Sequence, residues 1–417
     1  MRATEDMPAG NSVELAVIPR YVKALLQVLN FENRDGNGLR HLSDCEWRQL
    51  LELCDESQLT LLLGELGRPF LPIWVKARIQ RNASGNTLRF ERIKAATLEI
   101  ARWLRENSIE FALVKGHTHV PAFTPDPLLR AQNDIDIWCL PEEVFRARDV
   151  LTQHGYRHFG RSKGRHLDPL IRESGWKWTG DYFAPDLPIP VELHYELWDA
   201  VFECIPGPGE REIWQRRREA VLDEYAVATL DLADTLAFAA LHMMMHLFHG
   251  DVRLQRAWEI GYFLEHHTDD DAFWNRWRSL YSAEMRQMQV IAFLLTSRWF
   301  GCRLPKPICA ESDTLPRNVQ LWIRRYCFSP IESLFSPNKD ELWLNLALVP
   351  SLRGKLKVAG RRLFPVHAAS GGNPEQATNA SFTARARYHL GSLPRTLSAG
   401  FRLLQMRNHP TSQRRSS

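Results

Sequence analysis

Apolar side chains recur at helical spacing over most of residues 1–107, and this pattern predicts an N-terminal helical region. Ser43 is followed three residues later by Glu46, which is typical of a capping box at the start of a helix. A longer stretch, Ile73 to Glu106, predicts one long helix with a kink near Gly85. No cluster of chemically active side chains lies here, so we expect this region to serve for packing and to form part of the surroundings of the substrate.

Residues 108–204 alternate between strand and helix patterns, which predicts a small sheet with helices beside it. A helix is expected from Pro141 to about Gly155, because proline favours the first helical position and glycine the C-terminal cap. The predicted strands are Ile109–Val114, Asp134–Leu140, Trp176–Phe183 and Ile189–Leu197.

Helical spacing returns beyond Gly207, so residues 205–335 are expected to form a C-terminal helical domain. Its predicted helices are Leu232–Phe248, Arg253–His266, Asp270–Tyr281 and Glu284–Trp299. Residues 336–417 are expected to form a basic, partly disordered tail, with a basic amphipathic helix for an acidic partner or a membrane surface as the alternative. The fold class is therefore α+β, with a small mixed β-sheet core between N- and C-terminal helical regions.

The composition is that of an ordinary globular protein, with 44% apolar and 24% charged residues in a chain of 417. A net charge of +4 is no strong nucleic-acid signature. Seven scattered cysteines without a C-x-x-C pair favour a reduced, cytoplasmic protein over a disulfide frame or a zinc site. No signal-peptide pattern is seen, and no apolar run reaches the roughly 18–20 residues that a transmembrane helix needs.

Two carboxylates, Asp134 and Asp136, interrupt the second apolar strand pattern. Acids are depleted from strands, so their presence needs a reason. Side chains at i and i+2 leave the same face of a strand, so both can bind one divalent cation while Ile135 and Ile137 pack behind them. Such a pair suits Mg²⁺, which takes one or two carboxylates and completes its shell with water and phosphates. The alternative is a surface strand with solvated acids.

The segment from Val114 to Asp136 resembles nucleotidyltransferases of the superfamily typified by DNA polymerase β. It is most similar to bacterial nucleotidyltransferases whose core reads Leu-Lys-Gly, then Arg, then Asp-Ile-Asp. The matching residues here are Val114-Lys115-Gly116, Arg130 and Asp134-Ile135-Asp136. The resemblance implies a nucleotidyltransferase core in residues 108–204, with Asp134 and Asp136 as catalytic metal ligands and a third carboxylate from a later strand.

The third carboxylate is expected to be Glu192, because the resembled family has an acidic-apolar-His element that Val191-Glu192-Leu193-His194 matches. Glutamate replaces the more usual aspartate, and Glu196 on the same strand face is the fallback. His194 is a candidate for phosphate contact or proton transfer, with a satisfied histidine on a sheet face as the alternative.

The Lys115-Gly116 turn is expected to bind the triphosphate, because glycine lets backbone N–H groups approach phosphate and a following helix N-terminus favours an anion. Arg130 is expected to help from its loop; the alternative for Lys115 and Arg130 is a surface salt bridge. His117 stands where the superfamily usually has serine. Three further histidines, His242, His246 and His249, are expected at a core or cleft edge rather than in a zinc site.

Together these features predict an enzyme that uses Mg²⁺ or Mn²⁺ to move a nucleoside monophosphate from an NTP to an unidentified acceptor. The acceptor would be a hydroxyl or phosphate of a small molecule, a peptide, a protein or an RNA end. Two alternatives stay open. One is an inactive nucleotidyltransferase-fold scaffold, which the departures from the family pattern at His117 and Glu192 support; the other is a toxin-like transferase that modifies tRNA or protein.

Overall fold

The computed structural model describes residues 17–160, 164–173, 175–363 and 382–408. Its strands in this part of the chain form one mixed sheet of seven, in the order β3-β4-β5-β2-β1-β7-β6. At its centre β2 runs parallel to β5 and antiparallel to β1. The strands are β1 (Ala112–Leu113), β2 (Ile135–Trp138), β3 (Tyr156–His158), β4 (Leu170–Arg172), β5 (Val191–His194), β6 (Arg218–Leu222) and β7 (Tyr225–Thr229).

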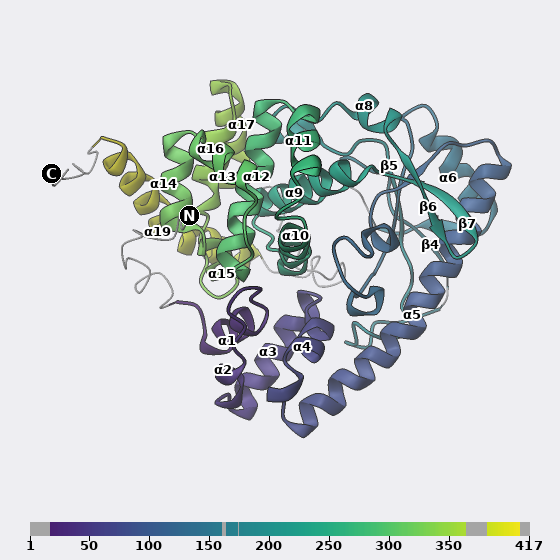
Figure 1. Ribbon diagram of the computed structural model, residues 1–417, viewed down its shortest axis with the longest axis horizontal. Helices are drawn as coiled ribbons and strands as arrows, with labels where there is room; N and C mark the ends of the chain where they lie inside the picture. Colours follow the sequence, from purple (N-terminus) through teal and green to yellow (C-terminus); the bar gives the residue numbers. More distant parts are fainter. Residues whose placement is uncertain (1–16, 161–163, 174, 364–381, 409–417) are drawn as a thin grey trace.

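The N-terminal helical region forms as its sequence pattern predicts. Ser43 accepts a hydrogen bond from the Glu46 backbone, and the Glu46 carboxylate accepts one from the Ser43 backbone, so the capping box is present. The long helix α5 (Ile73–Glu106) runs from this region to the sheet (Figure 1). The helices before it are α1 (Arg20–Val28), α2 (Asn37–Arg40), α3 (Asp44–Glu56) and α4 (Thr60–Leu66).

The α5 helix continues without interruption through Gly85. A Cβ there would lie 2.3 Å from the Phe183 carbonyl oxygen, so glycine serves close approach of the segment before β5. Phe183 packs with Leu61 and Ala131 in a small apolar cluster. Residues 176–183 form no strand, contrary to the sequence prediction. Phe183 and Tyr182 pack against neighbouring helices and a loop, and Trp178 packs against Tyr182 within the segment, so these aromatic side chains have contacts other than a paired strand.

The C-terminal helices begin where predicted, but a hairpin precedes them. Strands β6 and β7 lie within residues 205–335, predicted as wholly helical, and β7 extends the sheet by pairing with β1. The first helix after it, α9, is capped by Asp231 and ends at Gly250, which has a positive φ of 76°. The helices from residue 144 to 332 are α6 (Val144–Gln153), α7 (Ala200–Glu203), α8 (Glu210–Gln215), α9 (Leu232–His249), α10 (Leu254–His266), α11 (Asp271–Leu280), α12 (Ala283–Phe300), α13 (Lys306–Asp313), α14 (Arg317–Tyr326) and α15 (Ser329–Glu332).

The chain beyond residue 336 is more ordered than predicted, since it contains α16 (Glu341–Leu348), α17 (Leu352–Leu363) and α19 (Phe382–Asn408). These helices lie at the end of the molecule remote from the sheet (Figure 1). Pro394 lies within α19, and Arg395 next to it forms ion pairs with Glu332 and Asp340. Packing and ion pairing thus offset the helix-breaking residues. The rest of the predicted tail, residues 364–381 and 409–417, lies outside the described residues.

The two faces of the sheet differ in chemistry. Ile135 and Ile137 of β2 and Leu193 of β5 pack in an apolar cluster with α5 and α6. The opposite face carries Trp138 against Leu197 and Phe238 of α9. Because residues alternate along a strand, this opposite face also carries Asp136 and His194. None of the described helices is long and apolar enough to cross a bilayer.

Candidate active site

The pairing of β2 with β5 brings the two acidic strand segments together. Asp136 stands directly opposite Glu192, and Trp138 opposite His194, in a parallel ladder. Among the described residues, Asp136, Glu192 and His194 form the one group of three potential metal ligands, each offering an atom within 4.8 Å of the others. The sequence analysis expected Glu192 beside both aspartates, and the strand register places it opposite Asp136.

Asp136 is buried at the centre of this group. Its Oδ1 accepts from Lys115 Nζ at 2.5 Å and lies 2.8 Å from His194 Nε2. Burial alone would raise the pKa of Asp136, but Lys115 and His194 outweigh it and hold that pKa well below its usual range. The carboxylate is therefore ionised at neutral pH.

Glu192 is also ionised, although it is more accessible, with 23% of its side chain exposed. Burial raises its pKa, whereas His194, at 3.6 Å, and His166 lower it, so that its pKa is about 2. His166 Nε2 lies 3.8 Å from Glu192, and residue 166 forms a β-bridge with His194. Glu196 lies outside the metal-ligand group, so Glu192 is the acid beside Asp136.

Asp134 lies at the end of the loop before β2 and is not one of the three grouped residues. Burial, followed by the negative charges of Asp136 and Glu192, raises its pKa to about 6. Three carboxylates thus interact, and Asp134 is the one that gains a proton first as pH falls. A divalent cation would relieve this repulsion, so the set of hard oxygen donors fits Mg²⁺ or a similar ion.

His194 is better suited to orient Asp136 than to bind the ion. Its ring is fully buried, and its Nδ1 has no hydrogen-bond partner. A metal-bound histidine normally donates its other ring N–H to an acceptor, and His194 has none. Its Nε2 instead faces Asp136 Oδ1 at 2.8 Å, which leaves the carboxylates as the cation donors.

The Lys115-Gly116 turn lies against this group. Gly116 has a φ of +71°, and a Cβ there would come within 2.3 Å of the Gln132 side chain, so the turn requires glycine. A 3₁₀ helix of only four residues, Gly116–His119, follows, which is too short for the anion-binding helix N-terminus that the sequence suggested. Lys115 contacts a carboxylate here, and Phe238 lies beneath its ammonium at 5.9 Å.

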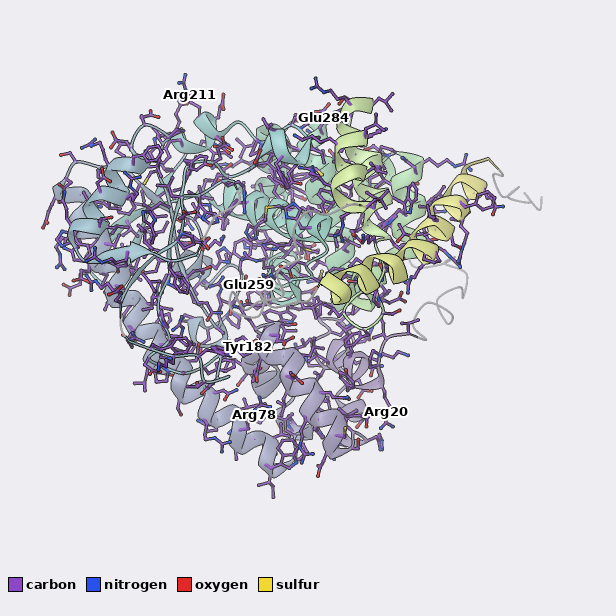
Figure 2. The ribbon with its side chains drawn as sticks, turned by 180° about the vertical axis from the view of Figure 1, so that it is seen from behind. Arg20, Arg78, Tyr182, Arg211, Glu259 and Glu284 are labelled. Carbon is purple, nitrogen blue, oxygen red and sulfur yellow. The ribbon has the colours of Figure 1, made fainter. Side chains whose placement is uncertain are left out.

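Arg130 lies in a separate ion-pair network. Its Nε donates to Glu259 Oε1 at 2.8 Å, with Gln255 Nε2 at 3.1 Å from the same oxygen and His119 Nδ1 3.4 Å from Glu259 Oε2. Figure 2 shows Glu259 near the middle of the molecule, on α10. Neither Lys115 nor Arg130 has the surface salt bridge that was the alternative, because both pairs are buried.

The three histidines of α9 have different partners and do not form a metal-ligand group among the described residues. His246 Nδ1 lies 3.0 Å from Asp251, and His249 Nε2 lies 3.0 Å from Glu203. His242 is buried, and its Nδ1 has no partner.

Sequence reasoning missed Arg89 of α5, which holds the two loops that lead into the site. Its buried guanidinium donates to the carbonyls of Gln132 and Asn133 before β2 and of Leu187 and Pro188 before β5. It also missed Arg256 on α10 and His166, which lack a recognisable motif. Only their surroundings in the folded chain identify these three residues.

Comparison with known proteins agrees with this geometry. A family model described as an uncharacterised nucleotidyltransferase matches residues 43–301, more than half of the chain. The chain belongs to this nucleotidyltransferase family. No curated protein and no solved structure matches the chain. The family match begins at the capping box of α3 and ends just after α12, so the family unit includes both helical regions beside the sheet.

Proposed function

We propose that this family member transfers a nucleoside monophosphate from an NTP to a hydroxyl or phosphate acceptor, with Mg²⁺ or Mn²⁺. The observation that supports it most is the register that places Glu192 opposite Asp136, with Asp134 at the end of the loop that leads into the strand. The charges of Asp136 and Glu192 also act on Asp134, and a divalent cation would relieve this repulsion.

The acceptor oxygen attacks the α-phosphorus, the bond to the bridging oxygen breaks, and pyrophosphate leaves. When bound, the divalent cation would neutralise charge on the triphosphate and on both oxygens of the displacement. Asp134, Asp136 and Glu192 would hold it, and His194 would orient Asp136. A hydroxyl acceptor must also lose a proton. Glu192, the more exposed acid beside Asp136, would orient the hydroxyl and accept that proton, which then passes to solvent.

Lys115 supports a second candidate, a scaffold that retains the fold without turnover. Its ammonium already neutralises Asp136 at 2.5 Å. In the active alternative, Lys115 turns from Asp136 to the phosphates once a cation binds.

One experiment separates these candidates. The purified protein is incubated with each α-labelled NTP and Mg²⁺, with and without cell extract, beside Asp136→Asn as a matched control that keeps side-chain volume. Label transferred by the wild type and lost in Asp136→Asn supports the enzyme, and its position on a metabolite, RNA or protein identifies the acceptor class. No transfer with any nucleotide under any condition would favour the scaffold.

A further inference from the structure

Arg256 is the unusual cation of the site. It lies on α10, is partly buried, and makes no hydrogen bond or ion pair with the described residues. Its neighbours on the helix and in the site are paired: Arg253 with Asp251, and Arg130 with Glu259. Burial lowers the pKa of Arg256, and the nearby Arg130 and Arg253 lower it further. A partly buried cation that contacts no anion among the described residues is destabilising, and an anionic ligand would supply the missing partner.

His242 on α9 is a second group without a partner. It is 5% exposed, and its Nδ1 contacts no hydrogen-bonding atom. Burial holds its pKa well below the usual value, and Arg256 and Lys115 depress it further. The ring is therefore neutral, lies near both cations, and has unused hydrogen-bonding capacity.

Both groups lie on the helices that contact the site. The His242 ring lies 5.7 Å from the Phe238 ring, and the Lys115 ammonium lies 5.9 Å from the same ring. Arg256 lies about one turn before Glu259 on α10. The charges of Asp136 and Glu259 act on Arg256, and the charge of Arg256 acts on Asp134. Lys115 approaches Asp136 from the end of β1, whereas Arg256 and His242 approach from α10 and α9. An anion held there would face cationic groups from both the sheet and the helices.

We propose that Arg256 and His242 bind the triphosphate tail of the nucleotide, opposite Lys115. This inference rests on the proposed function and differs from the expectation that Arg130 fills the role. The guanidinium offers two parallel N–H donors to phosphate oxygens, and the imidazole offers one more polar contact. A triphosphate and one divalent cation still carry net negative charge, which Arg256 and Lys115 would balance.

The test measures binding by calorimetry, without turnover. The ligands are ATP, GTP, CTP, UTP and inorganic tripolyphosphate, each with Mg²⁺, and the four nucleosides. The variants are Arg256→Gln, Arg256→Lys and His242→Gln. Arg303→Gln is the control, because Arg303 is an exposed arginine paired with Glu265 near the end of the same helix.

Arg256→Gln should lower the affinity for tripolyphosphate and for the NTP that binds by the same factor, at least about tenfold. This is the loss expected for charge-assisted hydrogen bonds. Nucleoside binding and Arg303→Gln should stay near wild type. Without ligand, Arg256→Gln should melt at the same or a higher temperature, because it removes an unpaired buried charge; a merely structural arginine would behave oppositely. Arg256→Lys keeps the charge but loses the two parallel donors, so its tripolyphosphate affinity should lie between those of the wild type and Arg256→Gln. It replaces the glutamine variant in the test if that variant fails to fold.

Equal tripolyphosphate affinity in wild type and Arg256→Gln would overturn this inference and leave the proposed function standing. Equal losses of affinity for nucleosides and for tripolyphosphate would also overturn it, because they would mean that the substitution disturbs the structure rather than phosphate recognition. Tripolyphosphate binding that depends on Arg256, without any NMP transfer, would support the anion site and contradict the proposed reaction. Absence of binding to every NTP and to tripolyphosphate would refute both.

Discussion

Asp134→Asn should stabilise the ligand-free protein at neutral pH, which is the opposite of what most substitutions at a partly buried position do. The pKa of Asp134 rises from its ordinary 3.8 to about 6 on folding, because burial, Asp136 and Glu192 all disfavour its charge. The folded state therefore binds more protons than the unfolded state between these two values, and wild-type stability from this group falls as pH rises from about 4 to about 6. Asparagine preserves the volume and cannot ionise.

The magnitude follows from the same linkage. One pH unit corresponds to about 1.4 kcal/mol, so a rise of the pKa from 3.8 to about 6 sets an upper limit of about 3 kcal/mol. Because Asp134 is only partly buried and its titration is coupled to two other acids, a gain of about 1–2 kcal/mol at pH 7 is the expected result.

Chemical denaturation of both proteins between pH 4 and pH 8 measures this difference, and subtraction removes the contributions of all other groups. The difference should be small or reversed near pH 4, grow to pH 6 and stay constant above it. Added Mg²⁺ should stabilise the wild type more than the variant. An asparagine variant that is less stable at pH 7, or a difference that does not change between pH 4 and pH 6, would refute the electrostatic account.

Three other substitutions test the surroundings of the site. Glu259→Gln should destabilise the protein by about 3–5 kcal/mol in denaturation, because it leaves buried Arg130 without its anion; Glu259→Leu with Arg130→Met should recover most of the loss, and no recovery would contradict the pairing. Arg89→Met should lower the melting temperature, as four carbonyls lose their donor, and should weaken Mg²⁺ binding more than a surface change such as Arg303→Gln. Lys115→Met should tighten Mg²⁺ binding in the absence of nucleotide by about tenfold, because the ion no longer competes with an ammonium for Asp136, while NTP affinity falls; unchanged Mg²⁺ affinity in calorimetry would contradict that competition.

Local patterns predicted much of this fold. The α5 helix has the predicted bounds, and the α3 helix begins at the predicted capping box. Each of these signals is carried by residues that are close together in the sequence. The β6–β7 hairpin was missed, because its two strands are short and half-exposed and follow a helix in the sequence. The predicted strand at Trp176–Phe183 was wrong because β-prone aromatic residues there pack on helices, and pairing partners decide a strand more than propensity does.

The candidate site shows the same division between local and long-range information. Asp134, Asp136 and Glu192 were proposed from alternation along a strand and from the family resemblance. The ladder between β2 and β5 brings Asp136 and Glu192 together, whereas Asp134 lies in the loop before β2 and outside the metal-ligand group. Arg89 could not be identified, since its function depends on four carbonyls from two loops that lie far along the chain. A guanidinium on a helix has no local sign of what it will contact.

The two arginines Arg130 and Arg256 make this point most clearly. A motif places Arg130 beside the aspartates, but a carboxylate 129 residues away, Glu259, takes up its charge in the fold. Arg256 has no motif, yet it is an arginine near the same aspartates that has no hydrogen-bond or ion-pair partner in the described part of the chain. Position near a motif reports where a side chain is anchored, and only the tertiary partners report whether its charge is available. For phosphate recognition the available charge is the one that matters, which is why α10, rather than the loop before β2, is the more informative place to look for the nucleotide.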